Sequence, residues 1–437
     1  MLGQSVLRDL AIYVHWPFCQ AKCPYCDFNS FARDGAALGA MDEGDWREAY
    51  RRELEHYARL LPYRRVSSVF FGGGTPSLME VETVGHVLET IARLWGIGSD
   101  VEVTLEANPG SAEAGKFAGF RAAGVDRLSL GVQSLREEDL RFLGRVHSVK
   151  EALQAIDLAR QIFPRFSFDL IYARRGQTLA AWELELREAL ALAGDHLSLY
   201  QLTIELNTVF HTRVRRGEVL TAEEIPSVEM YELTQGMMTE AGLPPYEISN
   251  HARAGQESRH NLTYWRYGDY VGIGPGAHGR YVGEDSNIWD ARLRGHDGVL
   301  GKFVPKYSRP TRLGGCPIGS WENHEAKSNH RVAIDNHRAP EIWMRQAREQ
   351  GQGARLVQPL DLDMAMREAL MMGLRLARGI DLARWRGMFG MPLGEYLPAG
   401  KRARLAQEGY WREDDKAMGL TSAGLQRLNA ILGYLLA

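Results

Sequence analysis

The chain has 437 residues, 45% of them hydrophobic and 24% charged, which predicts a globular protein of two or three units, or one barrel with an appendage. Its formal net charge of -3 gives no reason to expect a polyanion partner, and four cysteines are too few for a disulfide scaffold. The N-terminus lacks the pattern of a secretory signal and no apolar run reaches the roughly 18 residues of a membrane span, so we expect a cytoplasmic protein.

Short runs rich in strand-forming residues alternate with helical patterns through the first half of the chain. The runs begin at Ala11, Val66, Val101, Asp126, Phe166 and His196. Two of the helical patterns between them are Trp46, Tyr50, Leu54, Tyr57 and Leu61, and Val84, Val87, Leu88, Ile91 and Leu94. This alternation predicts parallel, right-handed βαβ units, and six such units make most of a (β/α) barrel.

The second half of the chain is less regular. A long helix is expected over residues 222–241, then a strand at PYEIS (245–249) and a glycine-rich run at 268–279. Residues 285–329 show no sustained period and contain one isolated cysteine, Cys316, so we interpret them as an insertion or a poorly structured loop.

Helical patterning returns at the C-terminus. Helices are expected over 361–378, 398–408 and 422–436, with a short β-wing at 410–421. This is the outline of a small winged-helix-like module, a shape that often binds DNA. Acidic residues flank the wing and would repel phosphates, so a structural role is favoured and no nucleic acid is expected as a partner. They are Glu408, Glu413, Asp414 and Asp415.

Three cysteines follow the first predicted strand with the spacing C-x3-C-x2-C. Cys19, Cys23 and Cys26 lie close enough in sequence to bind one face of an iron–sulfur cluster. Three thiolates on a four-iron cube leave one iron open to an exchangeable ligand. The alternative is a zinc site, which needs a fourth protein ligand, and His15 is the nearest candidate.

The second strand ends in Gly72-Gly73-Gly74-Thr75, either a tight turn or a loop that binds a ligand through its backbone. Further polar side chains stand at or near the ends of the other strands. They are Tyr13, Glu106, Gln133 and Asp169, with Arg145 twelve residues after Gln133. Each alone is an ordinary residue of an α/β fold. Their repeated position at carboxyl-terminal strand ends, where barrels build active sites, predicts one common site.

The cysteine motif, with Tyr25 before its last cysteine, resembles the radical S-adenosylmethionine (SAM) superfamily. This resemblance implies an α/β fold, a partial (β/α)6 barrel with a small C-terminal winged-helix-like domain. It also implies a [4Fe-4S] cluster held by Cys19, Cys23 and Cys26, whose open iron binds SAM. The residues implied for SAM are Tyr13, Tyr25, Gly73, Gly74, Thr75, Glu106, Gln133, Arg145 and Asp169, with Arg145 pairing with the SAM carboxylate as a bidentate fork.

A longer series of motifs resembles one branch of that superfamily. HWPFCQAKCPYCDFNSF, FFGGGTPSLM, TLEANPGS, DRLSLGVQSL, FDLIY and RHNLTYW occur in this order. They are similar to the branch of oxygen-independent coproporphyrinogen III oxidases and HemW-type heme chaperones. The oxidases carry a fourth cysteine where this chain has Phe28, and a longer segment before the motif, so the resemblance is nearer to the chaperones.

His260 and Tyr264 lie in HNLTY, which resembles the H-N-x-x-Y pattern that heme chaperones are associated with. Imidazole and phenolate both serve as axial ligands of heme iron, although without the resemblance His260 reads as a structural histidine. The chain departs from the family at Arg175, where proline is usual before Gly-Gln.

We therefore expect residues 1–250 to form the barrel, 251–284 the segment with the heme motif, 285–330 an insertion and 331–437 the C-terminal domain. The expected function is a heme chaperone that binds a [4Fe-4S] cluster, SAM and heme and passes heme to acceptor proteins, among them respiratory ones. The alternative is an enzyme of porphyrin biosynthesis, a coproporphyrinogen dehydrogenase that decarboxylates coproporphyrinogen III. An electron donor is implied, while a homodimer and peripheral membrane contact stay open.

Overall fold

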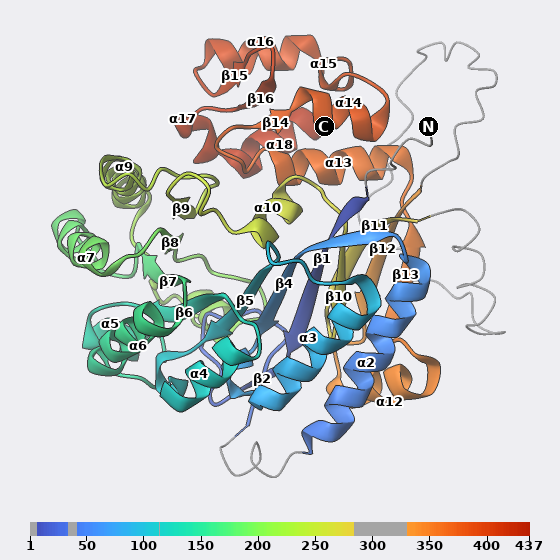
Figure 1. Cartoon of the computed structure of the whole chain (residues 1–437). Helices are drawn as coiled ribbons and strands as arrows, with labels where there is room; N and C mark the ends of the chain where they lie inside the picture. The colour runs from blue at the N-terminus through green and yellow to red at the C-terminus, as the bar shows by residue number, and fades with distance from the viewer. Residues whose placement is uncertain (1–6, 34–41, 113, 284–329) are drawn as a thin grey trace, which may run out of the picture.

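The computed structural model describes residues 7–33, 42–112, 114–283 and 330–437 (Figure 1). Six parallel strands form its centre, and each predicted strand of the first half is confirmed. In sheet order they are β1 (Arg8–Trp16), β4 (Arg64–Gly73), β5 (Glu102–Ala107), β6 (Arg127–Gln133), β7 (Arg165–Tyr172) and β8 (His196–Gln201). The strands have buried aliphatic and aromatic residues on the face that meets the helices, which fixes their register.

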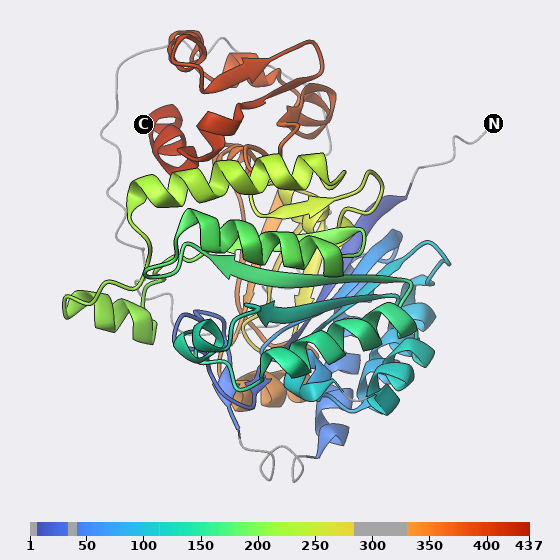
Figure 2. The same ribbon diagram turned by 90° about the vertical axis from the view of Figure 1, so that its left-hand side faces the viewer.

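Helices connect the parallel strands and cover the outer face of the sheet (Figures 1 and 2). The longer ones are α2 (Glu43–Leu60), α3 (Val81–Trp95), α4 (Ala114–Ala122), α6 (Val149–Ile162), α7 (Leu179–Leu192) and α9 (Glu224–Glu240). The predicted apolar sets on α2 and α3 are buried in one core, except for Leu94, which is partly exposed. Two short helices, α5 (Glu137–Phe142) and α8 (Val209–Arg215), follow β6 and β8.

The sheet continues beyond the six parallel strands at both edges, so it is a mixed sheet of eleven described strands. On one side β10 (Tyr270–Ile273) is parallel to β1, followed by the antiparallel strands β11 (His278–Gly283), β12 (His330–Asn336) and β13 (Ala354–Pro359). On the other side β9 (Asn250–Ala252) runs antiparallel to β8. Helices α10 (Arg259–Trp265) and α12 (Pro340–Gln350) belong to these extensions.

The expected strand at 245–249 is wrong. Only isolated bridges occur there, between Pro245 and His251 and between Glu247 and Leu376, and strand β9 begins afterwards at Asn250. A proline has no backbone N–H to donate to a ladder, and the chain has two in succession here. The insertion at 285–330, with Cys316, lies outside the described residues except for His330 at the start of β12.

The C-terminal unit has a core of its own around Trp385 and Trp411. Its predicted helices are confirmed in shorter form, and the last is divided in two. They are α13 (Leu362–Gly373), α16 (Ala399–Gln407), α17 (Ser422–Leu425) and α18 (Leu428–Leu436). The predicted wing is the hairpin of β15 (Trp411–Glu413) and β16 (Ala417–Leu420), to which β14 (Ile380–Asp381) adds. Helices α14 (Leu382–Phe389) and α15 (Leu393–Tyr396) were not predicted.

The C-terminal unit is joined to the barrel by polar contacts. Glu368 on α13 accepts hydrogen bonds from the Tyr267 hydroxyl at 2.7 Å and from Arg280 Nε at 3.1 Å. The backbone N–H of Ala377 donates to the carbonyl of Tyr246. Figure 2 shows α9 lying between α7 and this unit. Within the described residues, no helix combines the length and the apolarity needed to cross a bilayer.

Candidate functional site

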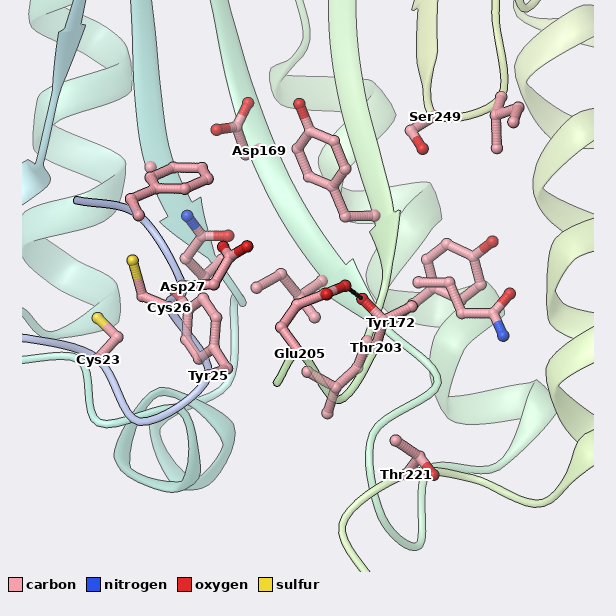
Figure 3. Close-up of a pocket in the computed structure, with 18 of the residues that line it drawn as sticks. Cys23, Tyr25, Cys26, Asp27, Asp169, Tyr172, Thr203, Glu205, Thr221 and Ser249 are labelled. Carbon is pink, nitrogen blue, oxygen red and sulfur yellow. Dashed lines mark hydrogen bonds between the residues drawn. The ribbon is translucent and has the colours of Figure 1, made fainter. Parts of the chain in front are cut away.

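A cavity of about 1290 Å³ opens at the carboxyl-terminal ends of the parallel strands (Figure 3). One side is formed by the cysteine loop, the floor by the ends of β4 to β8, and the far side by α9 and the C-terminal unit. This is the end of a parallel barrel at which connecting loops converge, and therefore the end at which ligands bind. The volume exceeds that of a typical pocket for one small molecule.

The cysteine loop forms one wall and is fixed by its own backbone. Cys19 ends the short strand β2 (Phe18–Cys19), which pairs with β3 (Phe31–Ala32), and the Cys26 N–H donates to the Cys23 carbonyl at 3.1 Å. Lys22 Nζ crosses the loop to the carbonyls of Phe28 and Ser30. All three thiols are free, and burial raises the pKa of Cys19 and Cys26.

In the described part of the chain, no three His, Cys, Asp or Glu side chains are grouped so as to bind a single metal ion. Three thiolates that bind three different irons of a cube stand farther apart than three that bind one ion, so the three cysteines still suit a four-iron cluster.

The glycine loop packs directly on the cysteine loop. Gly74 N–H donates to the Trp16 carbonyl at 2.7 Å, and Thr75 N–H donates to the Phe18 carbonyl at 2.8 Å. Gly73 has a φ of 113°, and a Cβ placed on Gly74 would lie 2.5 Å from the Phe18 carbonyl oxygen. Only glycine permits this conformation and this approach. The loop thus brings its backbone to the edge of the cavity beside the cysteines.

Two half-buried carboxyl groups face the cavity, from strands β5 and β7 on either side of β6. Glu106 accepts one hydrogen bond, from the Gly73 N–H at 3.3 Å, and Asp169 Oδ1 has no partner among the described residues. Burial, reinforced by the neighbouring charge of Asp169, raises the pKa of Glu106 to about 8. Burial raises the pKa of Asp169 to about 6. Buried polar atoms are normally bonded, so these groups fit a polar ligand in the cavity.

Gln133 and Arg145 complete this half of the cavity. Gln133 has a left-handed backbone with φ 72°, and its Oε1 is buried without a partner in the described structure. Arg145 donates to Cys23 Sγ at 3.3 Å, to Asn108 Oδ1 at 2.6 Å and to the Gly131 carbonyl at 2.8 Å. Because these bonds occupy the guanidinium, the expected bidentate fork is not free in this structure. Of the three guanidinium nitrogens of Arg145, only Nε is buried without a partner among the described residues.

Asn108 is a site residue that the sequence analysis did not select. Its Oδ1 accepts from Arg145 and its Nδ2 donates to Thr75 Oγ1 at 2.9 Å, so it joins the glycine loop to the arginine. Its position in the sequence could have indicated it, because Asn108 directly follows strand β5. Gln133 and Asp169, which were selected, likewise lie at or near the ends of β6 and β7.

The two predicted tyrosines are placed differently. Tyr25 lines the cavity, with its ring tilted against Phe210. Tyr13 does not line it: its hydroxyl bonds His15 Nδ1 at 3.0 Å and its ring stacks on Phe70 inside the barrel. Tyr13 therefore lies behind the cysteine and glycine loops, where it supports the wall of the cavity.

His260 and Tyr264 do not line the cavity that the cysteines face. They lie on α10, at the amino-terminal ends of the strands, and Figure 1 places α10 and β2 at opposite ends of the sheet. His260 is 1% exposed, its Nδ1 bonds Ser68 Oγ at 2.9 Å and its Nε2 bonds the Tyr264 hydroxyl at 2.7 Å. Burial lowers the pKa of His260 to about 3. The structure therefore does not bring the expected heme ligands into the cavity, and neither imidazole nitrogen is open.

The far half of the cavity is lined by residues that the sequence did not indicate. Figure 3 shows Tyr172, Thr203 and Glu205 across from Cys23 and Cys26, with the Thr203 hydroxyl donating to Glu205 at 3.0 Å. From the C-terminal unit come Arg375 and the residues Leu425, Gln426, Arg427, Leu428, Asn429 and Ala430. Their common feature is that they come together only in three dimensions, which local sequence patterns do not reveal.

Comparisons with known proteins show the family to which this chain belongs. Residues 13–189 match the model of the radical SAM superfamily, and residues 360–427 match the HemN C-terminal domain. A Bos taurus protein named "Radical S-adenosyl methionine domain-containing protein 1, mitochondrial" is 36% identical over 98% of this chain and 87% of its own length. The "Heme chaperone HemW" of Haemophilus influenzae is 38% identical over 70% of this chain and 81% of its own length.

Among solved structures, coproporphyrinogen III oxidase (HemN) from Escherichia coli superposes with a TM-score of 0.72. The superposition covers 98% of this chain and 90% of the oxidase. At 20% sequence identity it shows that the two proteins share a fold. The HemW of Escherichia coli is 40% identical over 64% of this chain and 73% of its own length. The chain therefore belongs to the radical SAM superfamily, in the HemN-like branch and close to HemW.

Proposed function

We propose that this chain is a heme chaperone that binds a [4Fe-4S] cluster, SAM and heme, and that transfers heme to acceptor proteins. Membership of the superfamily implies the cluster and SAM. The observation that carries the proposal is the convergence of the cysteine loop, the glycine loop and three unpartnered buried polar groups on one cavity. The heme role rests on the similarity to proteins named heme chaperones.

Cys19, Cys23 and Cys26 would hold the cluster, which supplies the electron for SAM chemistry when it is bound. The backbone of the glycine loop would bind the amino group of SAM, and Glu106 and Asp169 would accept hydrogen bonds from its hydroxyls. Gln133 and Arg145 Nε are the remaining open groups at this end. Because Arg145 also donates to Cys23, it would stabilise the charge of the thiolate that binds iron.

The heme site is the less constrained part of the proposal. His260 and Tyr264 are the heme ligands that the family resemblance suggests, and binding there requires the hydrogen bond between them to break. The far half of the cavity offers space beside the SAM residues, and Tyr172 and Tyr200 line it; tyrosine is a side chain that binds heme iron. We propose the cytoplasm as location, while the relatives from cattle, mouse and zebrafish are named mitochondrial.

The first test is iron and acid-labile sulfide analysis of protein reconstituted without oxygen, with an EPR spectrum of the reduced cluster before and after SAM is added. We expect iron and sulfide in a ratio near one and a spectrum that changes with SAM. Zinc in place of iron, or a spectrum that ignores SAM, would contradict the proposal.

The second test is heme titration followed by the Soret band, with wild type and the variants His260→Ala and Tyr172→Phe. The variant that shifts the band identifies the axial ligand. Transfer is then measured by mixing the heme-loaded protein with an apo-cytochrome. Formation of protoporphyrinogen from coproporphyrinogen III, SAM and a reductant would instead assign the decarboxylating activity.

A further inference from the structure

The turn after β7 contains two consecutive arginines, one exposed and one buried. Arg175, at the position where proline was expected, is exposed. Arg174 is turned inward and its side chain is 1% exposed. Its guanidinium donates to Glu185 Oε2 at 2.6 Å, lies 2.9 Å from Asp139 Oδ2, and donates to the Ile171 carbonyl at 2.7 Å.

Glu185 connects this arginine to the neighbouring strand end. It lies on α7, its side chain is also 1% exposed, and its second oxygen, Oε1, accepts from Ser134 Oγ at 2.6 Å and from the Leu135 N–H at 2.8 Å. Ser134 and Leu135 follow Gln133 directly. The buried ion pair therefore ties the exit of β7 to the exit of β6.

The residue beside this tie has an unfavourable backbone. Gln133 has φ 72°, a backbone conformation that residues other than glycine seldom adopt. It persists only where the surrounding structure imposes it. Glu185 bonds both of the next two residues and so fixes the chain directly after Gln133. In this conformation the Gln133 amide lines the cavity and its buried Oε1 has no partner among the described residues.

A buried ion pair is not needed for stability, because apolar residues of similar volume stabilise a core as well. An apolar pair would not supply the directed hydrogen bonds by which Arg174 and Glu185 hold the ends of β7 and β6. We propose that Arg174 is a positioning residue for SAM: through Glu185 it holds Ser134 and Leu135, and thereby directs the Gln133 amide toward the ligand. This inference rests on the proposed SAM site.

The experiment is a double-mutant cycle on the reconstituted full chain, with the SAM dissociation constant measured from the change in the EPR signal of the cluster. The variants are Arg174→Leu, Gln133→Ala and their combination. We expect Arg174→Leu to weaken SAM binding by about tenfold, the lower end of the effect of removing a residue that orients a ligand group. The double variant is expected to bind SAM no more weakly than Gln133→Ala alone, because Arg174 acts through Gln133.

Arg175→Leu is the matched control, since it makes the same chemical change one residue away at an exposed position, and we expect it to bind SAM as wild type does. If Arg174→Leu does not fold, Arg174→Lys, which keeps the charge but loses the forked contacts, is expected to give intermediate affinity. Additive losses in the cycle, or wild-type affinity in Arg174→Leu or Arg174→Lys, overturn the positioning role. No SAM binding by the wild type would instead refute the proposed function.

Discussion

At the scale of single residues, the site depends on close contacts between backbone segments as much as on the chemistry of its side chains. Gly74 has no room for a side chain, because the Phe18 carbonyl would lie 2.5 Å from its Cβ. Since Phe18 precedes Cys19, any displacement of Phe18 passes directly to Cys19, a proposed cluster ligand. The glycine loop and the cysteine loop therefore behave as one unit.

We expect Gly74→Ala to lower stability by about 1–3 kcal/mol, the range for overpacking, and to reduce the iron bound after reconstitution. Iron and sulfide analysis and urea denaturation measure the two effects. The matched control is Gly85→Ala on α3, where the new Cβ meets only Ala123 at 3.9 Å and alanine favours the helix. A Gly74→Ala protein with a full cluster and unchanged stability would contradict the close contact.

The carboxyl groups predict how SAM binding depends on pH. Burial and the charge of Asp169 raise the pKa of Glu106 to about 8, so below that pH the free protein holds the group largely protonated. If the carboxylate accepts hydrogen bonds from SAM, affinity increases as pH rises toward 8, by at most about tenfold per pH unit for one proton released. Binding titrations across this range measure it.

Glu106→Gln is expected to flatten that pH profile, because no proton remains to be released at position 106. Glu89→Gln, on the exposed side of α3, is the control and should keep the wild-type profile. A profile unchanged in Glu106→Gln would show that another group controls the pH dependence.

At the scale of elements, one buried carboxylate organises the edge of the sheet beside the cysteine loop. Glu53 on α2 accepts from the N–H groups of Gly274 and Gly353, from Trp343 Nε1 at 2.9 Å and from Asn336 Nδ2 at 3.1 Å. The four donors come from four different parts of the chain after β10. Burial raises the pKa of Glu53 to about 7 despite these donors.

Glu53→Gln replaces one acceptor oxygen with a donor that faces other donors, and we expect a loss of about 2–4 kcal/mol in unfolding free energy. Urea denaturation of the apo protein at pH 8, where the carboxylate is ionised, tests this. Glu48→Gln on the same helix breaks only surface ion pairs, with Arg51 and Arg52, and should cost less than about 1 kcal/mol. Equal effects of the two changes would refute the central role of Glu53.

The elements also show what sequence patterns predict well. The six parallel strands were found because each is a short run of strand-forming residues between helices of clear period, and their order puts Glu106, Gln133 and Asp169 at one end. Strands β11 to β13 pair with one another across long separations, and no local pattern marks that pairing. His260 is predicted as a heme ligand from a sequence motif, and a motif does not indicate at which end of the barrel its helix lies.

At the scale of the whole molecule, the cavity belongs to two units at once. Its floor comes from the barrel, and its far wall from α17 and α18 of the C-terminal unit. The sequence indicated both units but not that they share a cavity, because Leu425 and Leu428 read as ordinary core positions of a helix. The contacts of Glu368 with Tyr267 and Arg280 hold the units in this arrangement.

We expect Glu368→Ala to loosen this arrangement, so that calorimetry resolves a separate transition of the C-terminal unit at lower temperature, with a cost of about 1–3 kcal/mol for the lost charged hydrogen bonds. Glu395→Ala, an exposed carboxylate on α15, is the control and should leave the trace unchanged. A single unshifted transition in Glu368→Ala would show that apolar packing alone holds the units together.

The pairing of β11 with β12 has a consequence for the 46 residues from 284 to 329 that separate them. Gly283 and His330 are register partners, so the chain departs and returns at neighbouring points of one hairpin. A two-residue turn is enough to bridge such neighbours. The pairing of β11 with β12 therefore holds the two ends of this segment together, so a connection of a different length between Gly283 and His330 is compatible with the same sheet.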